Sequence, residues 1–134
     1  MVDKFSRIYI EINELLAYCT PMPDDESTAR LCRRIIKKLP MTYYGITLEI
    51  SELRNRVNPK KYINKKMRKI GQVFYREEGM IAALVYSGYF DMNPSVLSVQ
   101  FLADKIRILG IAKEGLLSQK TAYKATEKLR KIIV

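Results

Sequence analysis

Apolar residues return every three or four positions near the N-terminus, which predicts two amphipathic helices. The first helix spans residues 4–19, and its apolar stripe consists of Phe5, Ile8, Ile12, Leu15, Leu16 and Cys19. The run from Thr20 to Pro23, with prolines at positions 21 and 23, ends it. The second helix begins near Asp25 and stops at Pro40, and its buried face is expected to comprise Leu31, Cys32, Ile35, Ile36 and Leu39.

The chain changes character at residue 41. Residues 46–48 are β-prone and predict a brief strand, and residues 51–57 predict a short helix. Asn58 and Pro59 then favour a new helix start, because Asn caps free N–H groups and Pro needs no hydrogen bond at the first helical position. This helix covers residues 59–70, and Gly71 is placed to end it.

Residues 72–86 contain two apolar runs around Glu77-Glu78-Gly79, a pattern typical of a β-hairpin. A second Asn-Pro pair, at positions 93 and 94, predicts a helix as far as residue 109. Its inward face is expected to be Val99, Leu102, Ile106 and Leu109. Ser118 is expected to cap a last helix, whose apolar face is Ala122, Ala125, Leu129 and Ile132.

The order of elements between residues 25 and 86 resembles the winged helix-turn-helix superfamily. The likeness is carried by the strand at 45–48, the short helix 51–57, the Asn58-Pro59 turn, the helix 59–70 as recognition helix and the hairpin 72–86 as wing. The resemblance implies an α+β fold, mostly α-helical, with extra N- and C-terminal helices. We therefore expect a single domain over residues 1–134, with a winged-helix-like core at 25–86 and a C-terminal helical extension at 94–134.

Composition argues against an enzyme. The chain has no histidine, which excludes His general bases and His-ligated metals, and its six glycines form no phosphate-binding loop. Cys19 and Cys32 occupy apolar helix positions and are expected to be free thiols. The acidic run 24–26 fits a helix N-terminus better than a catalytic or metal site. The sequence thus predicts no catalytic activity, no cofactor and no metal.

Charge indicates an acidic partner. There are 24 Lys and Arg against 14 Asp and Glu, for a net charge of +10. Most of the excess lies between residues 52 and 76, around the helix 59–70, whose outward face carries lysines opposite an apolar stripe. The nucleic-acid-binding residues expected there are Arg54, Arg56, Lys60, Lys61, Asn64, Lys65, Arg68, Lys69 and Arg76. A second basic stripe in the last helix comprises Lys120, Lys124, Lys128 and Lys131. It indicates either a further nucleic-acid contact or a dimer or partner helix.

These features predict a cytoplasmic nucleic-acid-binding protein that acts by positioning and charge. Duplex DNA is the favoured partner, RNA is an alternative, and the role is that of a transcriptional regulator or an accessory DNA-binding factor. The rival interpretation is a small basic subunit of a larger nucleoprotein complex, such as an RNA-guided effector, that uses the winged helix for protein contacts. No run of the chain is long and apolar enough to predict a membrane span. Residues 94–134 are the expected surface for a homodimer or protein partner.

Overall fold

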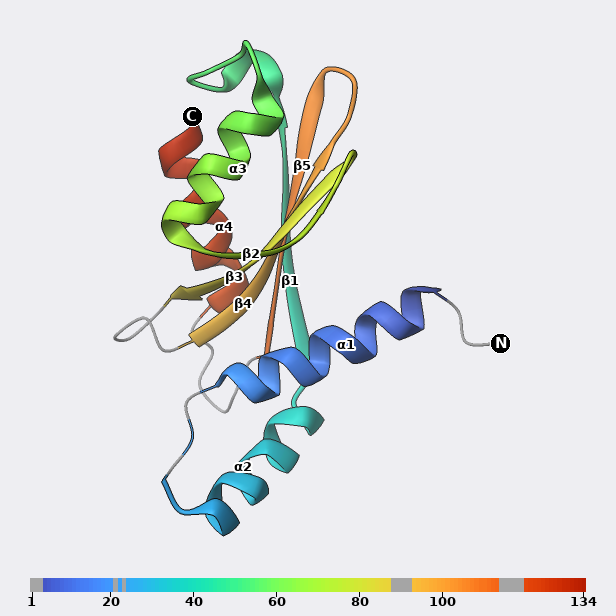
Figure 1. Cartoon of the computed structure of the whole chain (residues 1–134), viewed down its shortest axis with the longest axis vertical. Coiled ribbons are helices and arrows are strands. Elements are labelled where there is room, and N and C mark those ends of the chain that lie inside the picture. The colour runs from blue at the N-terminus through green and yellow to red at the C-terminus, as the bar shows by residue number, and fades with distance from the viewer. Residues whose placement is uncertain (1–3, 21, 23, 88–92, 114–119) are drawn as a thin grey trace.

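A five-stranded antiparallel sheet organises the protein, whose structure is a computed structural model that describes residues 4–20, 22, 24–87, 93–113 and 120–134. The strands are β1 (Met41–Glu49), β2 (Gly71–Glu77), β3 (Met80–Ser87), β4 (Asn93–Phe101) and β5 (Lys105–Lys113). Their order across the sheet is β1-β5-β4-β3-β2, so the first strand pairs with the last. Strands β2 to β5 form a meander, and β1 joins its far side (Figure 1).

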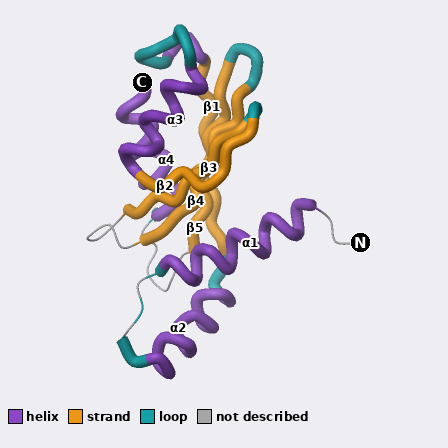
Figure 2. Tube along the Cα trace, viewed as in Figure 1, coloured by secondary structure: helices purple, strands orange, loops and turns teal. Residues whose placement is uncertain are grey.

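Helices cover both faces of this sheet. Helices α3 (Pro59–Ile70) and α4 (Thr121–Ile133) lie side by side on one face, as Figure 2 shows. Helix α1 (Lys4–Cys19) packs on the other face, and α2 (Glu26–Lys38) packs against α1 near one end of the sheet. The larger core lies between the sheet and α3 with α4, and it includes Ile63, Met67, Leu97, Ile108 and Leu129. A smaller core joins α1 to the sheet through Leu16, Leu84, Val96 and Ile111.

The winged-helix prediction is wrong, because β1, β2 and β3 form one sheet with β4 and β5, which lie in the expected C-terminal extension. Strand β1 is nine residues long and pairs along its whole length with β5, from Met41 opposite Lys113 to Glu49 opposite Lys105. The expected helix over 51–57 is absent, and a single 3₁₀ turn, η1 (Ile50–Glu52), takes its place. A core confined to 25–86 with a helical extension at 94–134 is therefore not what the chain forms.

The predicted helix 94–109 is also wrong, since these residues form β4 and most of β5. Both strands lie in the middle of the sheet and are covered on both faces in part of their length, so apolar residues occupy consecutive positions, as in Val96-Leu97. Apolar residues spaced at helical intervals can be picked out of such a run by chance. Ser118, the expected cap, lies outside the described residues; the last helix begins at Thr121, with Lys120 before it.

Several local predictions are confirmed. Helix α3 has the predicted bounds, and the Asn58 side chain accepts a hydrogen bond from the N–H of Lys61 at 3.2 Å. The hairpin of β2 and β3 follows it directly. Asp25 caps α2 by accepting from the N–H of Thr28 at 2.9 Å and its hydroxyl at 2.6 Å, which lowers the pKa of the Asp25 carboxyl. In α2, however, Leu31 and Ile35 are exposed rather than buried.

Two glycines allow close packing. Gly71 ends α3 with extended backbone, and a Cβ there would lie 2.2 Å from the carbonyl oxygen of Leu84. Gly110, in β5, lies under α4, where a Cβ would come within 2.6 Å of the Ala122 carbonyl oxygen and 2.7 Å of the Thr126 hydroxyl. The distance between α4 and the sheet therefore depends on the missing side chain at Gly110.

Gly110→Ala should destabilise the protein by about 1–3 kcal/mol, because α4 must shift to admit the added methyl group. Gly79→Ala is the matched control: a Cβ at Gly79 meets nothing within 4 Å, and its effect should stay within ~0.5 kcal/mol. Urea denaturation of both variants measures the difference. Equal stability of the two variants would contradict this packing of α4.

Candidate nucleic-acid interface

The outward face of α3 is as basic as its sequence predicts. Ile63 and Met67 are fully buried against the sheet, and Ile70 packs at the margin of the same core. The opposite side of the helix is exposed and presents Lys61, Lys65, Arg68 and Lys69, and Lys60 is exposed in the first turn. No acidic residue occurs within α3. The helix thus presents an uninterrupted positive face to solvent.

Helix α4 extends this face. The Tyr62 hydroxyl of α3 donates to the carbonyl oxygen of Ile132 in α4 at 3.2 Å, which fixes the two helices beside each other. Lys124 and Lys131 are exposed on α4. Lys128 is only half-exposed, and its ammonium donates to the Tyr86 carbonyl oxygen at 3.0 Å. Sequence analysis predicted both basic stripes but not that the fold would place them side by side.

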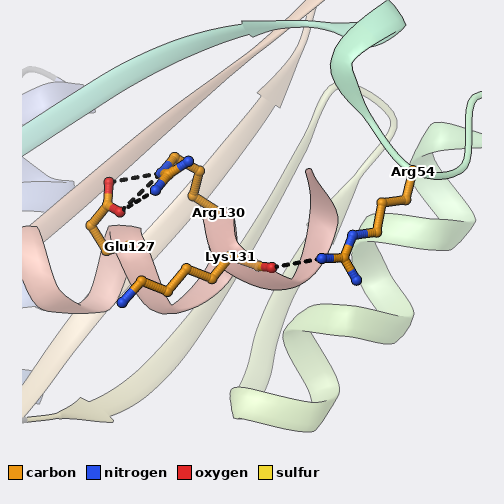
Figure 3. Close-up of polar contacts among 4 residues, drawn as sticks. All are labelled: Arg54, Glu127, Arg130 and Lys131. Carbon is orange, nitrogen blue, oxygen red and sulfur yellow. Dashed lines mark hydrogen bonds and ion pairs between the residues drawn. The ribbon is translucent and has the colours of Figure 1, made fainter.

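Two arginines near this face have partners within the protein (Figure 3). The Arg54 guanidinium donates to the carbonyl oxygens of Val134 at 2.7 Å and Lys131 at 3.4 Å, at the C-terminus of α4. A cation at this end of a helix satisfies free carbonyl groups and complements the helix dipole. Arg130 forms an ion pair with Glu127, with a shortest distance of 2.8 Å. Arg54 therefore stabilises the C-terminal end of α4, and Arg130 of the same helix neutralises the charge of Glu127.

The remaining predicted residues divide into three kinds. Arg56 and Lys120 are exposed, and Lys120 precedes α4 with a φ of 53°, an uncommon conformation for a residue with a side chain. Arg76 is exposed in β2 opposite Ile81, whose side chain lies in the core under the helices, so Arg76 belongs to the helical side of the sheet. Asn64 is half-buried, and its amide oxygen is buried without a partner among the described residues.

The lysines of α3 act on one another. The positive charge of Lys69 is the main reason why the pKa of Lys66 is lowered, and desolvation, Lys65 and Arg54 add to the effect. The Lys66 ammonium also lies 5.6 Å from the centroid of the Tyr62 ring. The neighbouring positive charges on α3 therefore lower the pKa of the Lys66 ammonium.

Helix α2 carries a further basic cluster that was not predicted from the sequence. Arg30, Arg33, Arg34, Lys37 and Glu26 line an open depression of about 270 Å³. The acids of α1 and the 24–26 run made this part of the chain look nearly neutral. The cluster could have been found from the positions of the basic residues around the helix, because Arg30, Arg34 and Lys37 share one side of α2. The total charge of the segment does not reveal this.

No protein family, curated protein or solved structure matches the chain. Within the described part of the structure, no helix is long and apolar enough to cross a membrane. The described residues contain no group of three or more Cys, Asp and Glu side chains positioned to hold a metal ion. Cys19 and Cys32 are half-buried free thiols.

Lys69→Gln should raise the pKa of Lys66 toward its ordinary value of 10.5, because it removes the charge that chiefly lowers it. Lys61→Gln, on the same helix but facing away from Lys66, should change that pKa much less. NMR titration of the Lys66 side chain would measure both effects. An equal response to the two substitutions would mean that the lysines do not form the cluster described.

Proposed function

We propose that the protein binds nucleic acid through the basic helical face, defined as the exposed sides of α3 and α4. The observation that carries this proposal is that two neighbouring helices on one sheet face direct lysines outward, while the acid among them, Glu127, is already paired with Arg130. A polyanion of regularly spaced phosphates matches such a surface in sign and in extent.

The energetics favour a polyanion over a solvated face without a partner. Like charges three and four residues apart oppose a helix by a few tenths of a kcal/mol each, and α3 has no acids to offset them. Binding to nucleic acid would remove this repulsion and release counterions condensed on the phosphates. The lowered pKa of Lys66 is the local sign of the same repulsion.

The arrangement favours contacts with phosphates over the reading of bases. Helix α3 lies flat on the sheet beside α4, so no single helix projects into a groove as a recognition helix does. Lysine is a point charge that contacts phosphates without base specificity, and Asn64, whose amide could pair with adenine, is half-buried. Between the two roles expected from the sequence, these features support an accessory factor that binds duplex DNA with little sequence preference.

A second candidate function is that of a subunit in a nucleoprotein assembly. The observation that favours it is the exposure of Leu31 and Ile35 on α2, at 56% and 54%, with Tyr18 of α1 at 73%. Arg30, Arg34 and Lys38 flank these residues, so the matching protein surface would be apolar and acidic. In that case α2 would contact protein, and the basic helical face would remain free for nucleic acid.

Changing Lys61, Lys65 and Arg68 together to Ala should leave stability within ~0.5 kcal/mol, because all three side chains are exposed. Binding should weaken for every duplex sequence. The slope of log K against log salt should fall by roughly 2.7, from about 0.9 per phosphate contact. Fluorescence anisotropy with labelled duplex DNA, single-stranded DNA and RNA, repeated over a salt series, would measure this.

The matched control is the triple substitution Arg30→Ala, Arg34→Ala and Lys38→Ala on α2, which removes the same net charge from exposed positions of another helix. It should leave the salt slope almost unchanged. A larger loss from the α2 triple than from the α3 triple would move the binding surface to α2. Absence of binding by the unaltered protein at low salt would contradict the proposal and favour the protein-subunit candidate.

A further inference from the structure

Strand β1 forms one edge of the sheet. It pairs with β5 on one side, and no described strand pairs on its other side. In an antiparallel pair, the N–H and C=O groups of every second residue point away from the partner strand, so β1 has a row of backbone groups that no described strand pairs with; the Glu49 N–H at its end donates to the Glu52 carboxylate at 2.8 Å. The pairing with β5 runs over nine residues without a register shift. From Met41 to Leu48 the strand contains no charged residue and no proline.

The opposite edge of the sheet differs. Strand β2 is shorter, with seven residues, and its pairing with β3 shifts register between Val73 and Tyr75. Such a bulge twists an edge strand away from regular pairing, and the charged Arg76 and Glu77 follow it. Proteins use these features to prevent edge-to-edge association, and β1 lacks them.

The sequence of β1 is complementary to itself in antiparallel register. With Gly45 opposite the Gly45 of a second copy, all nine residues overlap, and each side chain stays on its own face of the sheet. Tyr44 then lies opposite Ile46 of the second copy, and Tyr43 lies opposite Thr47. Both are pairs of an aromatic with a β-branched side chain, a combination that stabilises antiparallel strands. The central glycine admits the closest approach at the two-fold axis.

Exposed aromatic rings gather along the same edge. Tyr43 is 55% exposed on the α1 face of the sheet. On the helical face, the Tyr44 ring meets Tyr123 of α4 edge to face, with centroids 4.8 Å apart, and Tyr123 remains 43% exposed. Aromatic residues are enriched in protein–protein interfaces, and these rings lie where the second copy would add its own.

We propose that two copies of the chain associate through β1, antiparallel and centred on Gly45, into one continuous ten-stranded sheet. The two-fold axis is perpendicular to the sheet, so both basic helical faces lie on the same side. This interface centres on residues 41–49, with Tyr123 beside it, rather than on residues 94–134 as a whole. The dimer itself does not depend on nucleic acid. If the proposed function holds, the dimer presents two basic faces to a single duplex, and their contacts add by avidity.

A pair of double variants tests the register. In the proposed dimer, residue 43 of each copy lies opposite residue 47 of the other copy. The double variant Tyr43→Lys with Thr47→Lys therefore creates two pairs of facing lysines. The double variant Tyr43→Lys with Thr47→Glu creates two Lys–Glu pairs instead. Positions 43 and 47 are exposed, so both variants should keep the monomer fold. Because Thr47 lies opposite Arg107 of β5 in the same chain, Thr47→Lys adds a like-charge pair within the monomer and Thr47→Glu adds an ion pair, so the stability of both monomers is measured as well. Circular dichroism checks both points. Sedimentation equilibrium without nucleic acid should give twice 15.6 kDa for the unaltered protein. The dimer of the Lys/Glu variant should be at least roughly tenfold tighter than that of the Lys/Lys variant.

A purely monomeric unaltered protein at concentrations up to about 1 mM would overturn the proposal. A dimer that responds equally to the two double variants would place the interface elsewhere. Either result leaves the nucleic-acid proposal untouched, because the anisotropy measurements on the α3 triple variant test that proposal separately.

Discussion

The pairing of β1 with β5 is the constraint on which the rest of the structure depends. It joins the strand that follows α2 to the last strand of the meander, and it covers nine residue pairs. Because β1 and β2 lie at opposite edges, the chain between them must cross the sheet, and α3 makes part of that crossing. Helix α4 then returns over the same face, where Gly110 allows it to approach the sheet. Two basic helices become neighbours as a consequence of strand order.

This arrangement explains why some basic residues bind other parts of the protein, whereas others are exposed without such contacts among the described residues. Arg54 binds the carbonyl groups at the end of α4, and Lys113 donates to the carbonyl oxygens of Lys37 and Leu39 at the end of α2. Burial lowers the pKa of Lys113, as expected for a cation held against the protein. The exposed lysines of α3 have no such partner among the described residues, apart from the ring that Lys66 approaches. Their charge is therefore the part of the excess that the proposed function assigns to an external partner.

The sequence could predict what depends on neighbouring residues. Asn58 and Pro59 start α3, Asp25 caps α2, and the turn at Gly79 joins β2 to β3, because each of these features is determined within a few positions. The basic side of α3 follows from helical periodicity alone. The sequence could not predict that Thr42 pairs with Ala112, since strand pairing over such a separation leaves no local pattern. Without that pairing, residues 94–109 could be assigned to a helix, and the nearness of α3 and α4 could not be foreseen.

The central claim is that nucleic acid lies across the exposed sides of α3 and α4. Backbone amide chemical shifts recorded during titration with a short duplex DNA test it most directly, because they report every helix at once. We expect the largest changes in α3, with smaller changes in α4 near Lys124 and Lys131, and little change in α2 or around Arg107 on the opposite face of the sheet. Changes concentrated in α2 or on the Arg107 face, with α3 unaffected, would contradict it.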